Sequence, residues 1–195
     1  MKLENKVSII TGGAKGMGRD ISLTLAREGA DLVLASRDTN ALEKVASEVR
    51  SLGRRVEIVG TDVTNDAEVA AMVKRTLSVF GGRIDILVNV AGIPGPIETP
   101  LWDIEPAAFR EVLDVNVVGT FLPIKYVLPT MIDQRSGKIV TIGSTAGLRG
   151  YRNRAGYSAS KWAIRGLTRT IAIEVGPYNI NINCVIKYRI CFSYN

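Results

Sequence analysis

Short apolar runs alternate with helical stripes along nearly the whole chain, and this alternation restricts the fold more than any other feature. The runs predict strands over residues 6–10, 31–35, 56–59, 84–88, 139–142 and 181–185. They are solid apolar segments rather than alternating ones, as expected for parallel strands that are buried on both faces. We therefore predict an α/β fold, a doubly wound parallel sheet with helices on both faces and right-handed crossovers.

The segments between these runs carry apolar residues at helical spacing. One stripe, Leu42, Val45, Val49 and Leu52, ends at a glycine, as do the stripes that precede Gly29 and Gly81. Further helices are predicted over residues 106–115, 118–132 and 157–175. The chain has 195 residues and neither a linker nor a repeat, so a single domain is expected.

The composition is that of an ordinary globular protein, with 46% hydrophobic and 23% charged residues. No run reaches the ~20 apolar residues of a membrane helix, and the first residues lack the pattern of a signal peptide. Cys184 and Cys191 lie near the end of the sequence and suit reduced thiols better than a disulfide framework. We expect a cytoplasmic protein that does not bind membranes.

The net charge of +6 comes from scattered basic residues rather than a basic block or arm, which argues against a nucleic-acid partner. The densest group is Arg149, Arg152 and Arg154, between Ser144 and Tyr157. A solvated loop is the simplest interpretation of this group, and an anionic ligand is the next. The chain has no histidine, which excludes Ser-His-Asp triads, Cys-His pairs and histidine-ligated metals. No metal site is expected.

A glycine-rich segment, TGGAKGMG at residues 11–18, joins the first predicted strand to a helical stripe. Glycine allows a tight turn and lets the backbone approach a pyrophosphate, whose charge is stabilised at the N-terminus of the helix. Strand, glycine turn and helix in this order indicate a dinucleotide site more strongly than glycines alone.

A second group with chemical potential is Ser144, Tyr157 and Lys161. Ser144 follows a predicted strand, where open α/β sheets collect ligands. Tyr157 and Lys161 are four residues apart and thus share a helix face. Tyrosine titrates near ~10 in water, and a lysine cation beside it favours the phenolate, so Tyr157 could act as general acid or base. On spacing alone, an aromatic packing residue, a solvated lysine and a serine cap are an equally good interpretation.

Together these residues resemble the short-chain dehydrogenases/reductases, in their compact single-domain branch with a Rossmann-like fold. The markers are TGGAKGMG at 11–18, Asp62, NVAG at 89–92, Asn116, Ser144, and YSASK at 157–161, in the family's order over residues 1 to about 185. Val90 is a small departure, since asparagine is more frequent there. The resemblance implies a nicotinamide-dependent oxidoreductase that interconverts a small-molecule carbonyl and an alcohol.

The resemblance also implies the roles of the catalytic residues. Ser144 would hydrogen-bond the substrate oxygen, Tyr157 would transfer the proton, and Lys161 would bind the nicotinamide ribose and favour the phenolate. Asn116 would hold a water that links Lys161 to solvent. The cofactor site would comprise Gly12, Lys15, Gly16, Met17, Gly18, Ser36, Arg37, Asp62, Val63, Asn89, Ala91, Gly92, Tyr157 and Lys161.

The end of the second strand predicts a preference for NADP(H), with NAD(H) as the alternative. An acidic residue there accepts the free ribose hydroxyl of NAD, whereas arginine accommodates the 2′-phosphate of NADP. This chain has Ser36 and Arg37, with no acid before Asp38, and Lys15 lies in the glycine turn.

Two rival functions fit less well. A non-catalytic dinucleotide-binding scaffold usually loses the serine, tyrosine or lysine, and a nucleotide-sugar epimerase has different glycine spacing and a further domain. Family members usually associate through two long helices, here residues 118–132 and 157–175, so we expect a homodimer or homotetramer.

The resemblance stops at Val185. The family continues with a Pro-Gly turn, a substrate loop, more helix and a final strand, whereas residues 186–195 match none of these. We interpret residues 1–185 as the cofactor-binding and catalytic domain and 186–195 as a divergent tail of a truncated product without the usual last strand. We expect such a chain to be catalytically impaired and poorly soluble, with an open edge at residues 182–185. The alternative to an active oxidoreductase is an impaired truncated isoform that acts only as a dinucleotide-binding or oligomerising module. Alternatively, the tail substitutes for the missing strand.

Overall fold

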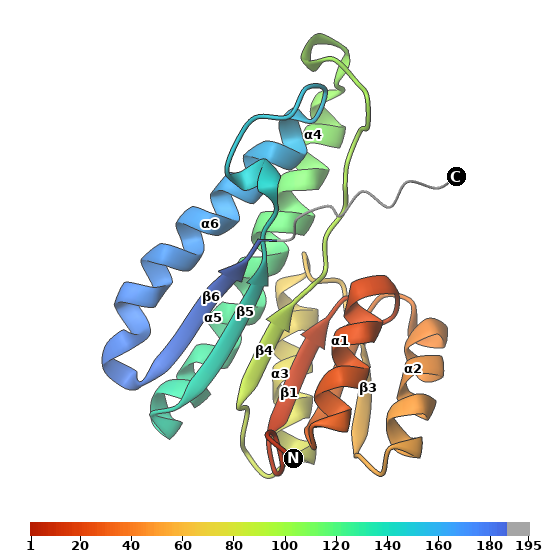
Figure 1. Cartoon of the computed structure of the whole chain (residues 1–195), viewed down its shortest axis with the longest axis vertical. Helices are drawn as coiled ribbons and strands as arrows, with labels where there is room; N and C mark the ends of the chain where they lie inside the picture. Colours follow the sequence, from red (N-terminus) through yellow and green to blue (C-terminus); the bar gives the residue numbers. More distant parts are fainter. Residues whose placement is uncertain (187–195) are drawn as a thin grey trace.

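The computed structural model describes residues 1–186. Within these residues, six strands form one sheet in the order β3-β2-β1-β4-β5-β6 (Figure 1). The strands are β1 (Val7–Thr11), β2 (Asp31–Ser36), β3 (Val56–Gly60), β4 (Ile86–Asn89), β5 (Gly137–Ile142) and β6 (Ile180–Val185). All neighbouring strands run parallel, and Ile9 of β1 lies opposite Val33 of β2 and Leu87 of β4. The predicted doubly wound parallel sheet is confirmed.

Helices cover both faces of the sheet and create two apolar cores. The helices are α1 (Gly16–Arg27), α2 (Thr39–Ser51), α3 (Asp66–Val79), α4 (Pro106–Leu113), α5 (Gly119–Gln134) and α6 (Ala155–Val175). Successive residues of a strand point to opposite faces. Ile9 therefore packs with Val127 of α5 and other residues of α3 and α6, while Ile10 packs with Leu42 of α2 and residues of α1.

The two halves of the sheet are not covered equally. Strands β1 and β2 are buried along nearly their whole length, whereas residues of β5 and β6 alternate between buried and exposed. Helices α1 and α2 lie against β1, β2 and β3 (Figure 1), so Lys138, Asn181 and Asn183 on the other half face solvent. The prediction that the strands are buried on both faces is thus wrong for β5 and β6.

The two helices predicted over residues 106–115 and 118–132 form one continuous helical run. A π-helical segment, Asp114–Val118, joins α4 to α5. Residues 106–134 are also the one described stretch long and apolar enough to cross a membrane. In the fold, Leu122, Ile124, Val127 and Met131 of this run are buried in the core against the sheet. Packing within the domain therefore accounts for its apolar composition.

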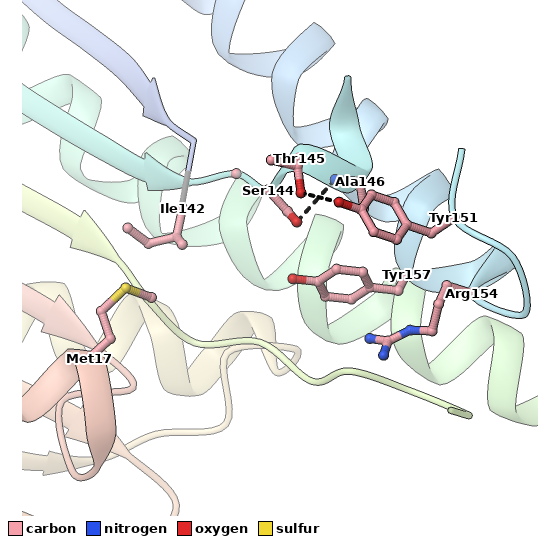
Figure 2. A pocket seen from close by; sticks show the side chains of 9 residues that line it. Met17, Ile142, Ser144, Thr145, Ala146, Tyr151, Arg154 and Tyr157 are labelled. Carbon is pink, nitrogen blue, oxygen red and sulfur yellow. Dashed lines mark hydrogen bonds between the residues drawn. The ribbon is translucent and has the colours of Figure 1, made fainter. Parts of the chain in front are cut away.

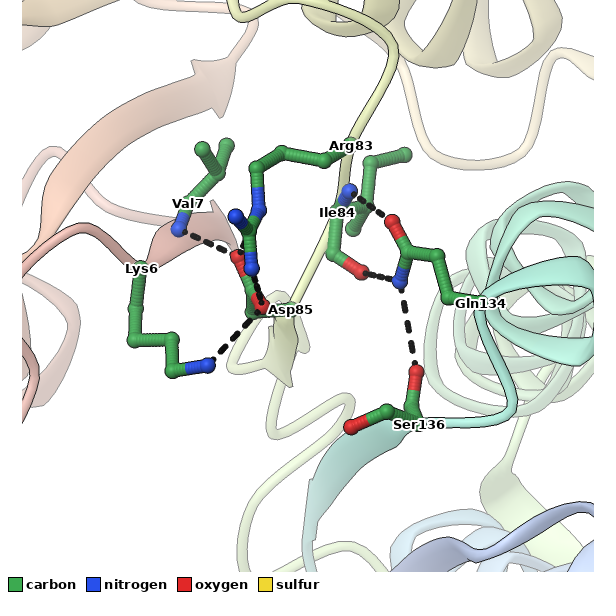
Figure 3. Close-up of polar contacts among 7 residues, drawn as sticks. All are labelled: Lys6, Val7, Arg83, Ile84, Asp85, Gln134 and Ser136. Carbon is green, nitrogen blue, oxygen red and sulfur yellow. Dashed lines mark hydrogen bonds and ion pairs between the residues drawn. The ribbon is translucent and has the colours of Figure 1, made fainter.

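The amino ends of the strands are joined by polar contacts around β4 (Figure 3). The carboxylate of Asp85 accepts hydrogen bonds from the Val7 N–H at 2.9 Å and from two nitrogens of Arg83 at 2.7 and 2.9 Å. Lys6 adds an ion pair at 3.4 Å. Gln134, at the end of α5, accepts from the N–H of Ile84 and donates to its carbonyl. These contacts fix the entry to β4 against β1 and α5.

Strand β6 is an edge strand within the described residues. The predicted tail lies outside them apart from Ile186, and so do Cys191 and the two alternatives considered for the tail. Those expectations remain predictions. Cys184 is described and is a free, half-buried thiol.

Candidate active site

The strand order reverses between β1 and β4. From β1 the chain passes through α1 to β2 on one side, while β4 and β5 lie on the other side. Such a reversal opens a crevice at the carboxyl ends of the strands, where α/β sheets bind ligands. The segments that follow β1, β4 and β5 all lie at this end of the sheet (Figure 1), and they contain the glycine turn, residues 90–92 and Ser144.

Three glycines in the turn after β1 have different roles. A Cβ atom on Gly12 would lie 2.7 Å from the nitrogen of Ala91, and one on Gly18 would lie 2.0 Å from the oxygen of Gly12, so close packing requires glycine at both positions. Gly16 has a φ of +49° and nothing within 4 Å of an added Cβ. The turn is therefore packed against β4 on one side and open beside the N-terminus of α1, which fits a dinucleotide phosphate.

A cavity of about 320 Å³ beside this turn collects most of the predicted residues for the adenosine half of a dinucleotide. Its lining includes Gly12, Lys15, Ser36, Arg37, Asp62, Val63, Ala91 and Gly92. Lys15 Nζ pairs with Asp38 at 2.8 Å, and Arg37 lies 3.9 Å from Asp62. Both cationic side chains are about three-quarters exposed, and such pairs contribute little to stability. Lys15 and Arg37 can therefore exchange these carboxylates for a ligand.

The acidic residues at this cavity are held by their own loops. Hydrogen bonds from the backbone and side chain of Thr64 lower the pKa of Asp62 below its usual value, despite partial burial. Asp38 accepts from the Ala41 N–H at 2.9 Å and so caps α2. Asn89 is buried, and its side-chain oxygen lies 3.5 Å from the hydroxyl oxygen of Thr11. The same Thr11 oxygen accepts a hydrogen bond from the N–H of Val90 at 3.2 Å. Thr11 thereby ties the glycine turn to the segment after β4.

Ser144 and Tyr157 line a second cavity, of about 390 Å³ (Figure 2). Met17 also lines it and so connects this cavity to the glycine turn. Ser144 caps the 3₁₀ helix Thr145–Gly147 by accepting from the Ala146 N–H at 3.1 Å. That bond uses the serine oxygen as acceptor, so the hydroxyl hydrogen can be donated to a ligand. Ser144 is thus a cap and a cavity residue at once.

Lys161, one helical turn after Tyr157, is buried, with 7% of its surface exposed. Its ammonium donates to the carbonyl of Ile142 at 2.8 Å and lies 5.5 Å from the centre of the Tyr157 ring. Burial lowers the pKa of Lys161 to about 8, and the nearby Cys184 opposes this effect. The interpretation of Lys161 as a solvated lysine, which the sequence allowed, is therefore wrong.

Asn116 lies in the π-helical segment, and its side chain is used for structure. Its amide accepts from the N–H of Ile93 at 2.8 Å and donates to the carbonyl of Ile93 and to Ser160 Oγ, both at 3.0 Å. Ser160 in turn donates to the carbonyl of Tyr157 at 2.7 Å. These bonds tie α6 to the segment after β4. The water-holding role expected for Asn116 remains a prediction.

Several residues at the site were not among the predicted site residues. Thr145, Tyr151 and Arg154 line the cavity of Ser144, while Thr11 and Ser160 hold its supporting segments. The arginine cluster was the only signal in the sequence for Arg154. Thr11 and Ser160 lie within the motifs at 11–18 and 157–161 but were given no role, and Thr145 and Tyr151 had no pattern of their own. Within residues 1–186, no three Cys, Asp or Glu side chains are placed to hold a metal ion.

Comparisons with known proteins agree with this geometry. A sequence model of the family described as short chain dehydrogenase matches residues 6–190. Levodione reductase from Leifsonia aquatica is 39% identical over 186 residues, a match that covers 94% of this chain and 69% of the relative. The structure of an NAD⁺-bound xylitol dehydrogenase matches with a TM-score of 0.91 and 38% identity, over 94% of this chain and 70% of the other. A metagenomic short-chain oxidoreductase in complex with NADP has a TM-score of 0.91 and 31% identity, over 97% and 85%.

Proposed function

The chain belongs to the short-chain dehydrogenase family, and we propose that it is an NADP(H)-dependent oxidoreductase that interconverts a small-molecule carbonyl and an alcohol. Tyr157 is the proposed general acid and base. One observation carries this proposal: the side chains of Ser144 and Tyr157 line a single cavity, and the buried ammonium of Lys161 lies beside the Tyr157 ring. A hydroxyl donor, a phenol and a cation at one site suit proton transfer to a carbonyl oxygen.

Ser144, Tyr157 and Lys161 have different roles in this reaction. Ser144 donates a hydrogen bond to the substrate oxygen, which holds the carbonyl beside Tyr157. The Tyr157 hydroxyl gives its proton to that oxygen as the alcohol forms, and the cation of Lys161 stabilises the phenolate left behind. In the reverse direction the phenolate accepts the proton of the alcohol. Asn116 and Ser160 act as positioning residues, because their hydrogen bonds fix the turn of α6 that carries Tyr157.

The residues present fit a nicotinamide dinucleotide. The open position at Gly16 suits a pyrophosphate, and the cavity between Lys15, Arg37 and Asp62 suits an adenosine. Such a cofactor, when bound, supplies the hydride that the carbonyl carbon gains, and is itself oxidised. Tyr157 would face its nicotinamide half, since Met17 joins the cavity of Ser144 and Tyr157 to the glycine turn, and Lys161 lies beside the Tyr157 ring.

The test is carbonyl-dependent oxidation of NADPH by the purified chain, followed at 340 nm with a panel of ketones and aldehydes. Tyr157→Phe removes the proton donor and little volume, so we expect it to abolish most of the activity while the circular dichroism spectrum is unchanged. Tyr178→Phe, an exposed tyrosine in the segment Gly176–Tyr178, is the matched control. Lys161→Ala should lower both the rate and the affinity for the cofactor. A Tyr157→Phe variant with near wild-type activity would refute the proposal.

The preference for NADP(H) is proposed from Lys15 and Arg37. The related structures do not distinguish between the two cofactors, because one of them is bound to NAD⁺ and another to NADP. In this chain both cations line one cavity with Ser36, and Asp38 is bound to the N-terminus of α2 and to Lys15 rather than aimed alone at a ribose. A phosphate dianion makes charge-assisted hydrogen bonds with such a pair of cations, which an uncharged hydroxyl cannot replace.

Titration of the purified protein with NADPH and NADH measures this preference. We expect NADPH to bind at least about tenfold more tightly, and Arg37→Asp to remove or invert the difference. Arg152→Asp, an equal change of charge at an exposed residue away from the cavity, is the control. Equal affinities in the wild type would contradict the assignment.

A cytoplasmic location, with neither a nucleic-acid nor a membrane partner, completes the proposal.

A further inference from the structure

The three arginines between Ser144 and Tyr157 have different surroundings in the structure. Arg152 is exposed, and Arg149 stacks on Tyr151 and donates to its hydroxyl. Arg154, at the start of α6, is half-buried and lines the cavity that also contains Ser144 and Tyr157. Of the three, only Arg154 is among the residues that line this cavity.

The guanidinium of Arg154 lies against the face of the Tyr157 ring, with its central carbon 4.8 Å from the ring centre. In Figure 2 the Tyr157 ring lies between Arg154 and Tyr151. One terminal nitrogen of Arg154 reaches the carbonyl of Pro94 at 3.4 Å, a long hydrogen bond. The Nε atom is buried and has no hydrogen-bond partner within residues 1–186.

This guanidinium is also uncompensated in charge. No carboxylate of residues 1–186 forms an ion pair with Arg154, and the residues that line the cavity include neither Asp nor Glu. By contrast, Arg83 has its carboxylate within 2.7 Å. The Nε donor costs free energy because it is buried without a partner, and the charge of the half-buried guanidinium has no counterion. A bound anion at Arg154 would supply that counterion.

We infer that the substrate is anionic: a carboxylate close to the reacting carbonyl binds Arg154 while the carbonyl oxygen binds Ser144 and Tyr157. This inference rests on the proposed function and narrows it to the interconversion of a keto acid and a hydroxy acid. Arginine suits a carboxylate because its planar nitrogens can form two parallel hydrogen bonds. The guanidinium packs on the ring that carries the reacting hydroxyl, so acid and ketone must be near neighbours in the substrate.

The experiment compares three keto acids, pyruvate, acetoacetate and benzoylformate, with their uncharged methyl esters in the NADPH assay. For at least one pair, the wild type should favour the acid in kcat/KM. Arg154→Gln should lower kcat/KM by about tenfold to a hundredfold more for that acid than for its ester, since only the acid loses charge-assisted hydrogen bonds. Arg154→Lys should recover part of the loss, and Arg152→Gln should change neither compound.

The outcomes separate this inference from the proposed function. Reduction of the esters at the same or a higher rate than the acids would overturn the inference and leave the oxidoreductase intact. If no compound is reduced, the proposed function fails in the assay, and calorimetric binding of the three acids and their esters to the NADPH-saturated protein decides the inference. Acid-selective binding that disappears in Arg154→Gln supports it, whereas equal binding of acid and ester, or no binding of any acid, overturns it. Circular dichroism verifies that the variants are folded.

Discussion

Lys161 shows at the scale of one residue what the proposed site costs the fold. Lysine side chains are seldom buried without an acidic partner, yet Lys161 is 7% exposed and its one hydrogen bond within residues 1–186 goes to the carbonyl of Ile142. Burial lowers the pKa of Lys161 to about 8, against an ordinary value of 10.5. The native state therefore holds this proton less tightly than the unfolded chain does, which destabilises the fold wherever the lysine is charged.

Lys161→Met should consequently stabilise the protein in the absence of cofactor. Below pH 8 both states are protonated and the full penalty applies, so we expect a gain on the order of 2 kcal/mol after loss of the Ile142 hydrogen bond. The wild type should recover stability between about pH 8 and 10.5, and the gain of the variant should shrink over that interval. Urea unfolding across this pH range measures it.

Lys74→Met on the exposed side of α3 is the control and should show no such pH dependence. A Lys161→Met protein less stable than the wild type at pH 7 would contradict the prediction. It would mean that the ammonium stabilises the loop after β5 more than its burial costs.

At the scale of secondary-structure elements, the carboxyl and amino ends of the strands have different roles. The carboxyl ends leave loops free to form cavities, whereas the amino ends are closed by the contacts around Asp85 and Gln134 (Figure 3). Burial raises the pKa of Asp85, but hydrogen bonds from Arg83 and Val7 and the charges of Arg83 and Lys6 outweigh it, so the pKa lies below its usual value. Asp85 stabilises the junction of β1 and β4 only while it is ionised.

Asp85→Asn should destabilise the fold at neutral pH by about 2 kcal/mol, because hydrogen bonds to a charged group are lost while the shape is kept. A depressed native pKa contributes stability above the unfolded value near ~3.9, and that stability is lost as the pH falls through the native value. The difference between wild type and variant should therefore begin to shrink as the pH falls below the unfolded value. Thermal unfolding from pH 7 down to pH 3 measures it, and Asp133→Asn at an exposed position is the control. A constant difference down to pH 3 would show that charge is not responsible.

At the scale of the whole molecule, α5 and α6 present an apolar groove on their outer side. Its lining includes Phe121, Leu128 and Pro129 from α5 and Leu167 and Ile171 from α6. Phe121 is 42% exposed, and Ile173 of α6 is 80% exposed. Exposed apolar surface of this kind marks interaction sites.

We therefore predict that the chain forms a homodimer or homotetramer through this groove. Light scattering coupled to size exclusion should give a multiple of the monomer mass, and Phe121→Asp should shift it to the monomer. Trp102→Asp should leave the mass unchanged, because this side chain is 84% exposed and does not line the groove. A wild-type protein of monomer mass would contradict the prediction.

The sequence by itself determined the local chemistry and the order of elements. Short apolar runs predicted every strand of the sheet and helical stripes predicted the helices between them, and this alternation predicted that the strands are parallel. The glycine turn, Ser144, Tyr157 and Lys161 were recognisable because residue type and short spacing constrain what they can do. Even the arginine cluster was visible, although two interpretations of it, a solvated loop and an anionic-ligand site, were open.

Only the tertiary structure decided what depends on distant neighbours. The surroundings of Lys161 depend on β5, which supplies the Ile142 carbonyl, and on β6, where Cys184 opposes the effect of burial on the lysine pKa. The duty of Asn116 depends on Ile93 and Ser160, which are 23 and 44 residues away. The structure distinguishes Arg154 from Arg152, because Arg154 lines a cavity whereas Arg152 is exposed to solvent. Burial, hydrogen-bond partners and electrostatic surroundings arise from contacts that no local sequence period encodes.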